Sequence, residues 1–185
     1  MSIPGLQPAD ALIIVDVQND FCPGGALAVP DGDEVVEPIN RLLSQASFAV
    51  ATRDWHPPDH GSFLELGGLW PVHCVQGSVG AELRHDLELG AIDVVIDKGR
   101  SADREGYSAF EDTELEHLLR ARGVDAVHVA GLALDYCVKA TALDARRMGF
   151  DVVVHRDATR AVDGAPGDGE RAVSELQAAG VRMEP

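Results

Sequence analysis

The stretch AVHVAGLALDYCVKATALDARRMG, residues 126–149, indicates the fold class. Its first part is a short apolar run that stops at Gly131, which is typical of a buried parallel strand. The part from Asp135 to Gly149 predicts a helix, because an acid stands near its start, two arginines stand near its end and a glycine follows. A strand that leads directly into a helix is the repeating unit of parallel sheets.

The same alternation extends to both sides of this stretch. We expect a parallel sheet with helices on both faces. The length of 185 residues suits one domain, residues 1–185, with a sizeable core. The predicted strands cover 11–17, 47–54, 91–97, 125–131, 150–158 and 181–184, and the predicted helices cover 34–46, 113–122, 135–149 and 168–180.

The charge of the chain argues against two classes of partner. The formal net charge is -16 at pH 7, so a nucleic acid or an anionic membrane surface would be repelled. The N-terminal residues show neither the basic nor the apolar part of a signal peptide. Three cysteines are an odd number without a metal-type CxxC pair, which favours a reduced, cytoplasmic location.

Ionisable residues stand where the predicted strands end. Asp16, Asp54 and Lys98 follow three of the apolar runs, and Cys137 comes six residues after the fourth run ends. Ligands of open parallel sheets bind beyond the carboxyl ends of the strands. Because buried strand ends rarely need charged groups, we expect these side chains to form a site.

Cys137 has two interpretations. A cysteine on one helix face is often only a small buried side chain. As a nucleophile it would need a lowered thiol pKa, which a helix N-terminus and a nearby Lys98 would favour. Asp16 could then accept the thiol proton. Cys22 and Cys74 lack this setting and are expected to be packing residues.

The segment RDWHPPDHGSF and the later WPVHC predict a metal site. Asp54 and His56 are two residues apart, so in an extended segment they point to the same side. Together with His73 they supply one carboxylate and two imidazoles, a common set of ligands for a divalent ion. His60 and Glu65 are further candidate ligands or supporting residues. Zinc, iron and manganese all suit these ligand types.

Five motifs carry a resemblance over about residues 11 to 160. DVQNDFCPGGAL, TRDWHPPDHGSF, WPVHCVQGS, DKG followed by YSAF, and GLALDYCV resemble, in this order, the motifs of the nicotinamidase family, which belongs to the isochorismatase-like cysteine hydrolases. The resemblance implies a Rossmann-like, three-layer α/β/α fold with a mostly parallel six-stranded sheet. It also implies that nicotinamide, and pyrazinamide as a related aromatic amide, is hydrolysed through a thioester with the help of one divalent metal ion.

The resemblance assigns roles to residues of this sequence. Asp16, Lys98 and Cys137 would match the catalytic triad of the family, and the backbone amides of Ala133 and Cys137 would match its oxyanion hole. The peptide between Leu132 and Ala133 would be cis. The metal ligands would be Asp54, His56 and His73, and the residues lining the ring pocket would be Phe21, Trp70 and Tyr107.

Other functions stay open at this point. Isochorismatases and N-carbamoyl amidases share the superfamily, and we expect both to lack the Asp-His-His cluster. A domain that binds metal or senses redox state without catalysis would explain a reactive cysteine and the histidines, but not the carboxylate and lysine at strand ends. A homo-oligomer is possible, although no part of the sequence specifies an interface.

Overall fold

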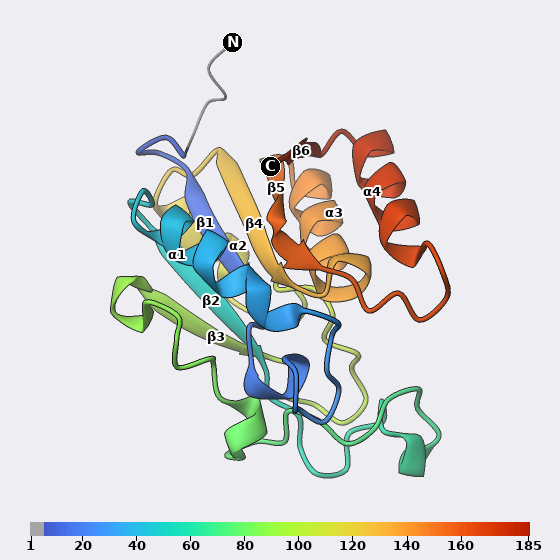
Figure 1. Cartoon of the computed structure of the whole chain (residues 1–185). Coiled ribbons are helices and arrows are strands. Elements are labelled where there is room, and N and C mark those ends of the chain that lie inside the picture. Colours follow the sequence, from blue (N-terminus) through green and yellow to red (C-terminus); the bar gives the residue numbers. More distant parts are fainter. Residues whose placement is uncertain (1–5) are drawn as a thin grey trace.

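The computed structural model describes residues 6–185, which form one six-stranded sheet in the order β3-β2-β1-β4-β5-β6 (Figure 1). Every pair of neighbouring strands is parallel. This is the Rossmann-like order, in which successive strands are added towards one edge from β1 to β3 and towards the other edge from β4 to β6, so the predicted fold class is confirmed. The strands are β1 (Ala11–Val15), β2 (Ala49–Asp54), β3 (Val94–Lys98), β4 (Ala126–Leu132), β5 (Asp151–Arg160) and β6 (Arg182–Glu184).

Four α-helices cover the two faces of the sheet and complete the three layers. One face packs against α1, which lies in front of the strands in Figure 1, and the opposite face packs against the other three helices. The helices are α1 (Val36–Leu43), α2 (Leu115–Ala121), α3 (Lys139–Arg147) and α4 (Asp168–Ala178).

The central strand β1 is buried on both faces, which explains its unbroken apolar sequence. Ile13 belongs to the core cluster beneath α2, α3 and α4, whereas Leu12 and Ile14 belong to the cluster beneath α1. This split follows from the twofold alternation of side chains along a strand. The two cores hold β1 rigidly, so the residue that follows it, Asp16, has a fixed position.

The predicted helix over 135–149 differs from the observed chain at its start. Residues Leu134–Val138 form a π-helical turn, in which the amide of Val138 donates to the carbonyl oxygen of Ala133 at 3.0 Å, and α3 begins only at Lys139. The wider turn places Cys137 close to the carboxyl end of β4. Other predicted helices shorten at their ends: the first helix starts with a 3-10 turn, Gly32–Val35, and α2 begins at Leu115.

A long irregular excursion joins β2 to β3. It contains only short 3-10 turns, at Leu64–Leu66, Val79–Ala81 and Leu89–Ala91. Two isolated bridges, between His56 and Val75 and between Phe63 and Trp70, fold the excursion back on itself. The residues after β2 therefore lie next to residues about twenty positions later.

Among residues 6–185, no helix has the length and apolar character that crossing a membrane requires. The three cysteines are free and buried.

Candidate active site

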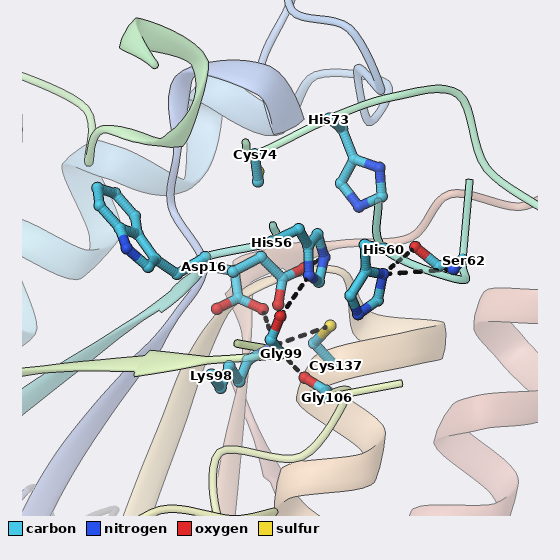
Figure 2. Close-up of polar contacts among 12 residues, drawn as sticks. Asp16, His56, His60, Ser62, His73, Cys74, Lys98, Gly99, Gly106 and Cys137 are labelled. Carbon is cyan, nitrogen blue, oxygen red and sulfur yellow. Dashed lines mark hydrogen bonds and ion pairs between the residues drawn. The ribbon is translucent and has the colours of Figure 1, made fainter. Parts of the chain in front are cut away.

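Lys98 lies at the centre of a buried polar cluster at the carboxyl ends of the strands (Figure 2). Its Nζ is 2.7 Å from Oδ2 of Asp16, 2.6 Å from Oδ1 of Asp54 and 2.7 Å from the carbonyl oxygen of Gly106. Sγ of Cys137 lies 3.5 Å away. Asp54 and Lys98 are partners in the register of β2 and β3, which brings their side chains to the same side of the sheet. The structure thus brings together all four residues that the strand ends predicted.

The charges of this cluster are set by burial and by mutual contact. Burial alone would lower the pKa of Lys98, but the charges of Asp16 and Asp54 hold that pKa well above its ordinary value, so the ammonium persists. Burial raises the pKa of Asp16 to about 6, a shift that Lys98 opposes and Asp54 reinforces. Burial also raises the pKa of Asp54, but Lys98 and His56 outweigh burial and hold it well below its usual value.

The expected low thiol pKa of Cys137 is wrong for this arrangement. Burial raises the pKa of Cys137 well above the ordinary value, and the nearby carboxylates of Asp16 and Asp54 add to the effect of burial. Lys98 lowers the pKa, but its one charge is shared between two carboxylates and the thiol. The resting side chain is therefore a neutral thiol, next to a carboxylate whose raised pKa suits it to accept a proton.

Asp54, His56 and His73 form a group that can hold a metal ion, with ligand atoms that all lie within 4.8 Å of one another. The Nδ1 atoms of both histidines are occupied: His56 Nδ1 is 2.9 Å from the carbonyl oxygen of Gly99, and His73 Nδ1 is 2.8 Å from that of Pro71. A carbonyl oxygen only accepts, so each Nδ1 carries the proton and each Nε2 keeps a free lone pair. One carboxylate and two such imidazoles fit a divalent cation.

Neither of the two further candidate ligands points into this group. The His60 ring stacks on His56, with ring centroids 3.9 Å apart, and its nitrogens bond Ser62 Oγ at 2.7 Å and the carbonyl oxygen of Arg104 at 2.8 Å. Glu65 is exposed in the excursion. His60 therefore supports the ring of a candidate ligand.

A cavity opens beside Cys137 and the metal group. Phe21, Trp70 and Tyr107 line the cavity, and so does Tyr136, which sequence reasoning missed although it precedes Cys137 directly. Trp70 Nε1 donates to the hydroxyl oxygen of Tyr107 at 2.9 Å, and the Tyr136 ring meets the Trp70 ring edge-on at a centroid distance of 4.9 Å. These aromatic walls suit a flat ring.

The backbone at the end of β4 also faces the cavity. The Leu132–Ala133 peptide is cis, as the resemblance implies, and Ala133 and Cys137 both line the cavity. The carbonyl oxygen of Ala133 accepts the amides of Tyr136 and Val138 at 3.1 and 3.0 Å, which are the neighbours of the Cys137 amide on either side.

Gln18 is a second residue that sequence reasoning missed. Its buried side chain accepts the Asp54 amide at 2.8 Å and donates to the Asp54 carbonyl oxygen at 2.9 Å. Gln18 therefore connects the end of β1 to Asp54, which belongs both to the cluster around Lys98 and to the metal group. The only sign of Gln18 in the sequence is that a side-chain amide stands directly after an apolar strand, where a buried side chain is expected.

The fold and the buried site define the class of this protein. The family model described as the isochorismatase domain matches residues 10–183, so the chain belongs to the isochorismatase family. Its relatives within that family include several nicotinamidases. The nicotinamidase of Escherichia coli (strain K12) is 44% identical over 201 residues, which cover 95% of this chain and 94% of the relative.

Two solved structures are similar over nearly their whole length. The pyrazinamidase of Pyrococcus horikoshii in complex with zinc shares 46% identity with a TM-score of 0.85, covering 95% of this chain and 98% of that one. PnC1 from L. infantum in complex with nicotinate shares 42% identity with a TM-score of 0.93, covering 99% of this chain and 96% of that one.

Proposed function

We propose that this protein is a metal-dependent cysteine amidohydrolase that converts nicotinamide to nicotinate and ammonia. The observation that carries the proposal is the position of Lys98, which contacts Asp16 and Cys137 on one side and Asp54 of the metal group on the other. The similarity to nicotinamidases over nearly the whole chain supports the choice of substrate. The Asp-His-His cluster favours this function over those of an isochorismatase or an N-carbamoyl amidase.

The first half of the reaction uses Asp16 as the base. Its pKa of about 6 leaves it ionised at neutral pH, so it can take the proton of the Cys137 thiol as Sγ bonds to the carboxamide carbon. Because the thiol pKa is high, the proton leaves during the attack rather than before it. Lys98 keeps its proton, and its positive charge balances the negative charge that moves from Asp16 to Sγ of Cys137.

The oxyanion of the tetrahedral intermediate requires donors on the cavity wall. We assign the amides of Ala133 and Cys137 to this role, in which one donor is worth about 3 kcal/mol in a comparable hydrolase. Protonated Asp16 then gives its proton to the departing ammonia, which leaves an acyl thioester on Cys137. Asp16 next accepts a proton from the water that attacks the thioester, and Cys137 leaves as the thiol when nicotinate forms.

The aromatic residues Phe21, Trp70 and Tyr107 bind the ring and orient its amide towards Cys137. A divalent ion held by Asp54, His56 and His73 supplies, when bound, a Lewis acid for the lone pair of the ring nitrogen. Zinc, iron and manganese all suit this set of ligands. The zinc bound by the related pyrazinamidase supports this assignment.

One experiment tests the activity and the metal together. Ammonia release is measured with nicotinamide, pyrazinamide and an aliphatic amide, and metal content is determined on the same sample. We expect turnover of both aromatic amides, little turnover of the aliphatic amide, and close to one divalent ion per chain. Preference for a carbamoyl or vinyl ether substrate, with no bound metal, would contradict the proposal.

We also infer a reduced, cytoplasmic location, which three free and buried cysteines support. The single domain over residues 1–185 and a homo-oligomer stay predictions.

A further inference from the structure

A short segment that follows β3, residues 99–106, lies against both the cluster around Lys98 and the metal group. We call this segment the strap. Its backbone carbonyl oxygens, rather than its side chains, make the contacts. The carbonyl oxygens of Gly99, Ala102, Arg104 and Gly106 accept hydrogen bonds from His56 Nδ1 at 2.9 Å, from the Gly61 amide at 2.8 Å, from His60 Nε2 at 2.8 Å and from Lys98 Nζ at 2.7 Å.

The first residue of the strap determines how His56 presents itself to the metal group. The carbonyl oxygen of Gly99 accepts the Nδ1 proton of His56 (Figure 2). Nε2 is therefore the nitrogen that faces Asp54, 3.5 Å from its Oδ2. No larger residue fits here without movement. A Cβ on Gly99 would lie 2.5 Å from Cε1 of the His56 ring, and its φ of +60° is rare for other residues.

The last residue of the strap determines how Lys98 distributes its protons. An ammonium group has three protons, but four acceptors surround Nζ: Asp16, Asp54, Gly106 and Cys137. The first three lie at 2.6 to 2.7 Å, whereas Sγ lies at 3.5 Å. Because sulfur is larger than oxygen, the 3.5 Å contact of Sγ is also a hydrogen bond, so the carbonyl oxygen of Gly106 competes with the thiol for the three protons of Nζ.

The two ends of the strap touch each other. A Cβ on Gly106 would lie 2.6 Å from the backbone nitrogen of Gly99 and closer still to its Cα, so the two backbones are in direct contact because residue 106 is a glycine. Glu111 holds this crossing from outside, since its Oε2 accepts the Gly106 amide at 3.2 Å. A displacement of either end must therefore move the other.

We propose that the strap is a positioning element that couples the two halves of the site: contact between Gly99 and Gly106 makes the orientation of His56 and the hydrogen bonding of Lys98 depend on each other. Gly99 and Gly106 act through the side chains they hold, and neither of them lines the cavity. This proposal rests on the proposed function for the identity of the metal group and of the nucleophile.

The test measures each half of the site when the opposite end of the strap is changed. The dissociation constant of Zn²⁺, added alone to the metal-free protein, is measured by competition with a coloured chelator. The rate constant for alkylation of Cys137 by iodoacetamide at pH 8 is measured by peptide mapping. We expect Gly106→Ala, which touches no metal ligand, to weaken Zn²⁺ binding about tenfold or more. We expect Gly99→Ala, whose added Cβ would meet His56 and neither the Lys98 side chain nor Cys137, to change the alkylation rate about threefold or more.

Two further variants separate this coupling from a general loss of stability. Gly123→Ala is the matched control, because Gly123 has a φ of +67° like the strap glycines, and a Cβ there would meet nothing within 4 Å. It should lower the melting temperature and leave both readouts unchanged. Glu111→Ala loosens the strap without adding a Cβ, so it serves if a strap glycine variant does not fold. We expect it to weaken Zn²⁺ binding about threefold, with the exposed Glu114→Ala unchanged.

The outcomes are distinct. If each glycine variant alters only the group that its own residue contacts, or if Glu111→Ala binds Zn²⁺ like the unmodified protein, the strap does not couple the two halves. Neither readout uses nicotinamide. An unmodified protein that binds no Zn²⁺ would instead contradict the proposed metal group, and a protein that binds Zn²⁺ but releases no ammonia would contradict the proposed reaction.

Discussion

Oδ1 of Asp54 and Nζ of Lys98 form an ion pair at a distance of 2.6 Å. This pair joins the cluster around Lys98 to the metal group, which are separate motifs in the sequence. One oxygen of Asp54 contacts the lysine, and the other lies 3.5 Å from Nε2 of His56 in the metal group. A buried lysine therefore balances a candidate metal ligand and the candidate base at once. The ammonium of Lys98 and the carboxylate of Asp54 therefore hold the two groups of the site against each other.

Replacing the nucleophile tests the role of Cys137. Cys137→Ala should lower the rate of ammonia release from nicotinamide by about 10⁴-fold or more, as removal of a hydrolase nucleophile does. Cys22→Ala is the control, because Cys22 is equally buried but lies outside the cavity lining. Steady-state assays and circular dichroism on both variants check this. Near-normal turnover by the folded Cys137→Ala protein would exclude the assigned nucleophile.

The rate should depend on pH through Asp16. This residue acts as a base only when ionised, and burial raises its pKa to about 6, so kcat/KM should fall about tenfold per pH unit below that value. A bound divalent cation would favour the carboxylate and move this limb to lower pH, never to higher pH. A pH–rate profile measures the limb. In Asp16→Asn the rate should be low at every pH, and a variant that kept the limb would place the base elsewhere.

The metal group should lose affinity when one of its histidines is removed. His73→Ala should weaken divalent-ion binding about 100-fold or more, whereas Glu65→Ala should bind like the unmodified protein, because Glu65 is exposed in the excursion. A chelator should abolish turnover, and an added divalent ion should restore it. Equal losses in both variants would mean that Glu65 is a ligand.

A second buried cluster, formed by His128 of β4 and His155 of β5, predicts a loss of stability in acid. Nδ1 of His128 lies 2.8 Å from Nε2 of His155, and burial lowers the pKa of both rings. The unfolded chain therefore binds more protons than the folded one as pH falls below about 6.5, and unfolding becomes easier by up to about 1.4 kcal/mol per pH unit for each histidine. Urea unfolding from pH 7.5 to 5 measures this slope.

His128→Gln should reduce that slope, and the exposed His117→Gln should keep it. Slopes are compared because Asp16, whose pKa is raised, acts in the opposite direction and strengthens the fold as pH falls. An unchanged slope in His128→Gln would show that the pair does not govern acid unfolding.

The fold could be predicted from the sequence because its signals are local. The apolar run at 11–17 and the strand followed by a helix over 126–149 each depend on neighbours within one element, and the elements they predict are present. The element ends were less predictable. The π-helical turn at Leu134–Val138 replaces the first turn of the expected helix, because the Ala133 carbonyl oxygen accepts the amide of Val138.

The sequence alone determined which residue types stand at the strand ends, because parallel strands present their carboxyl ends along one edge. That was enough to group Asp16, Lys98 and Cys137 and to propose the metal cluster. Only the tertiary structure decided how their charges are distributed, since a pKa depends on burial and on every charge nearby. It placed Cys137, whose thiol pKa is raised rather than lowered, beside a carboxylate of raised pKa. It also placed the strap against both the cluster around Lys98 and the metal group. The strap makes these contacts with backbone carbonyl groups, which leave no signal in the sequence.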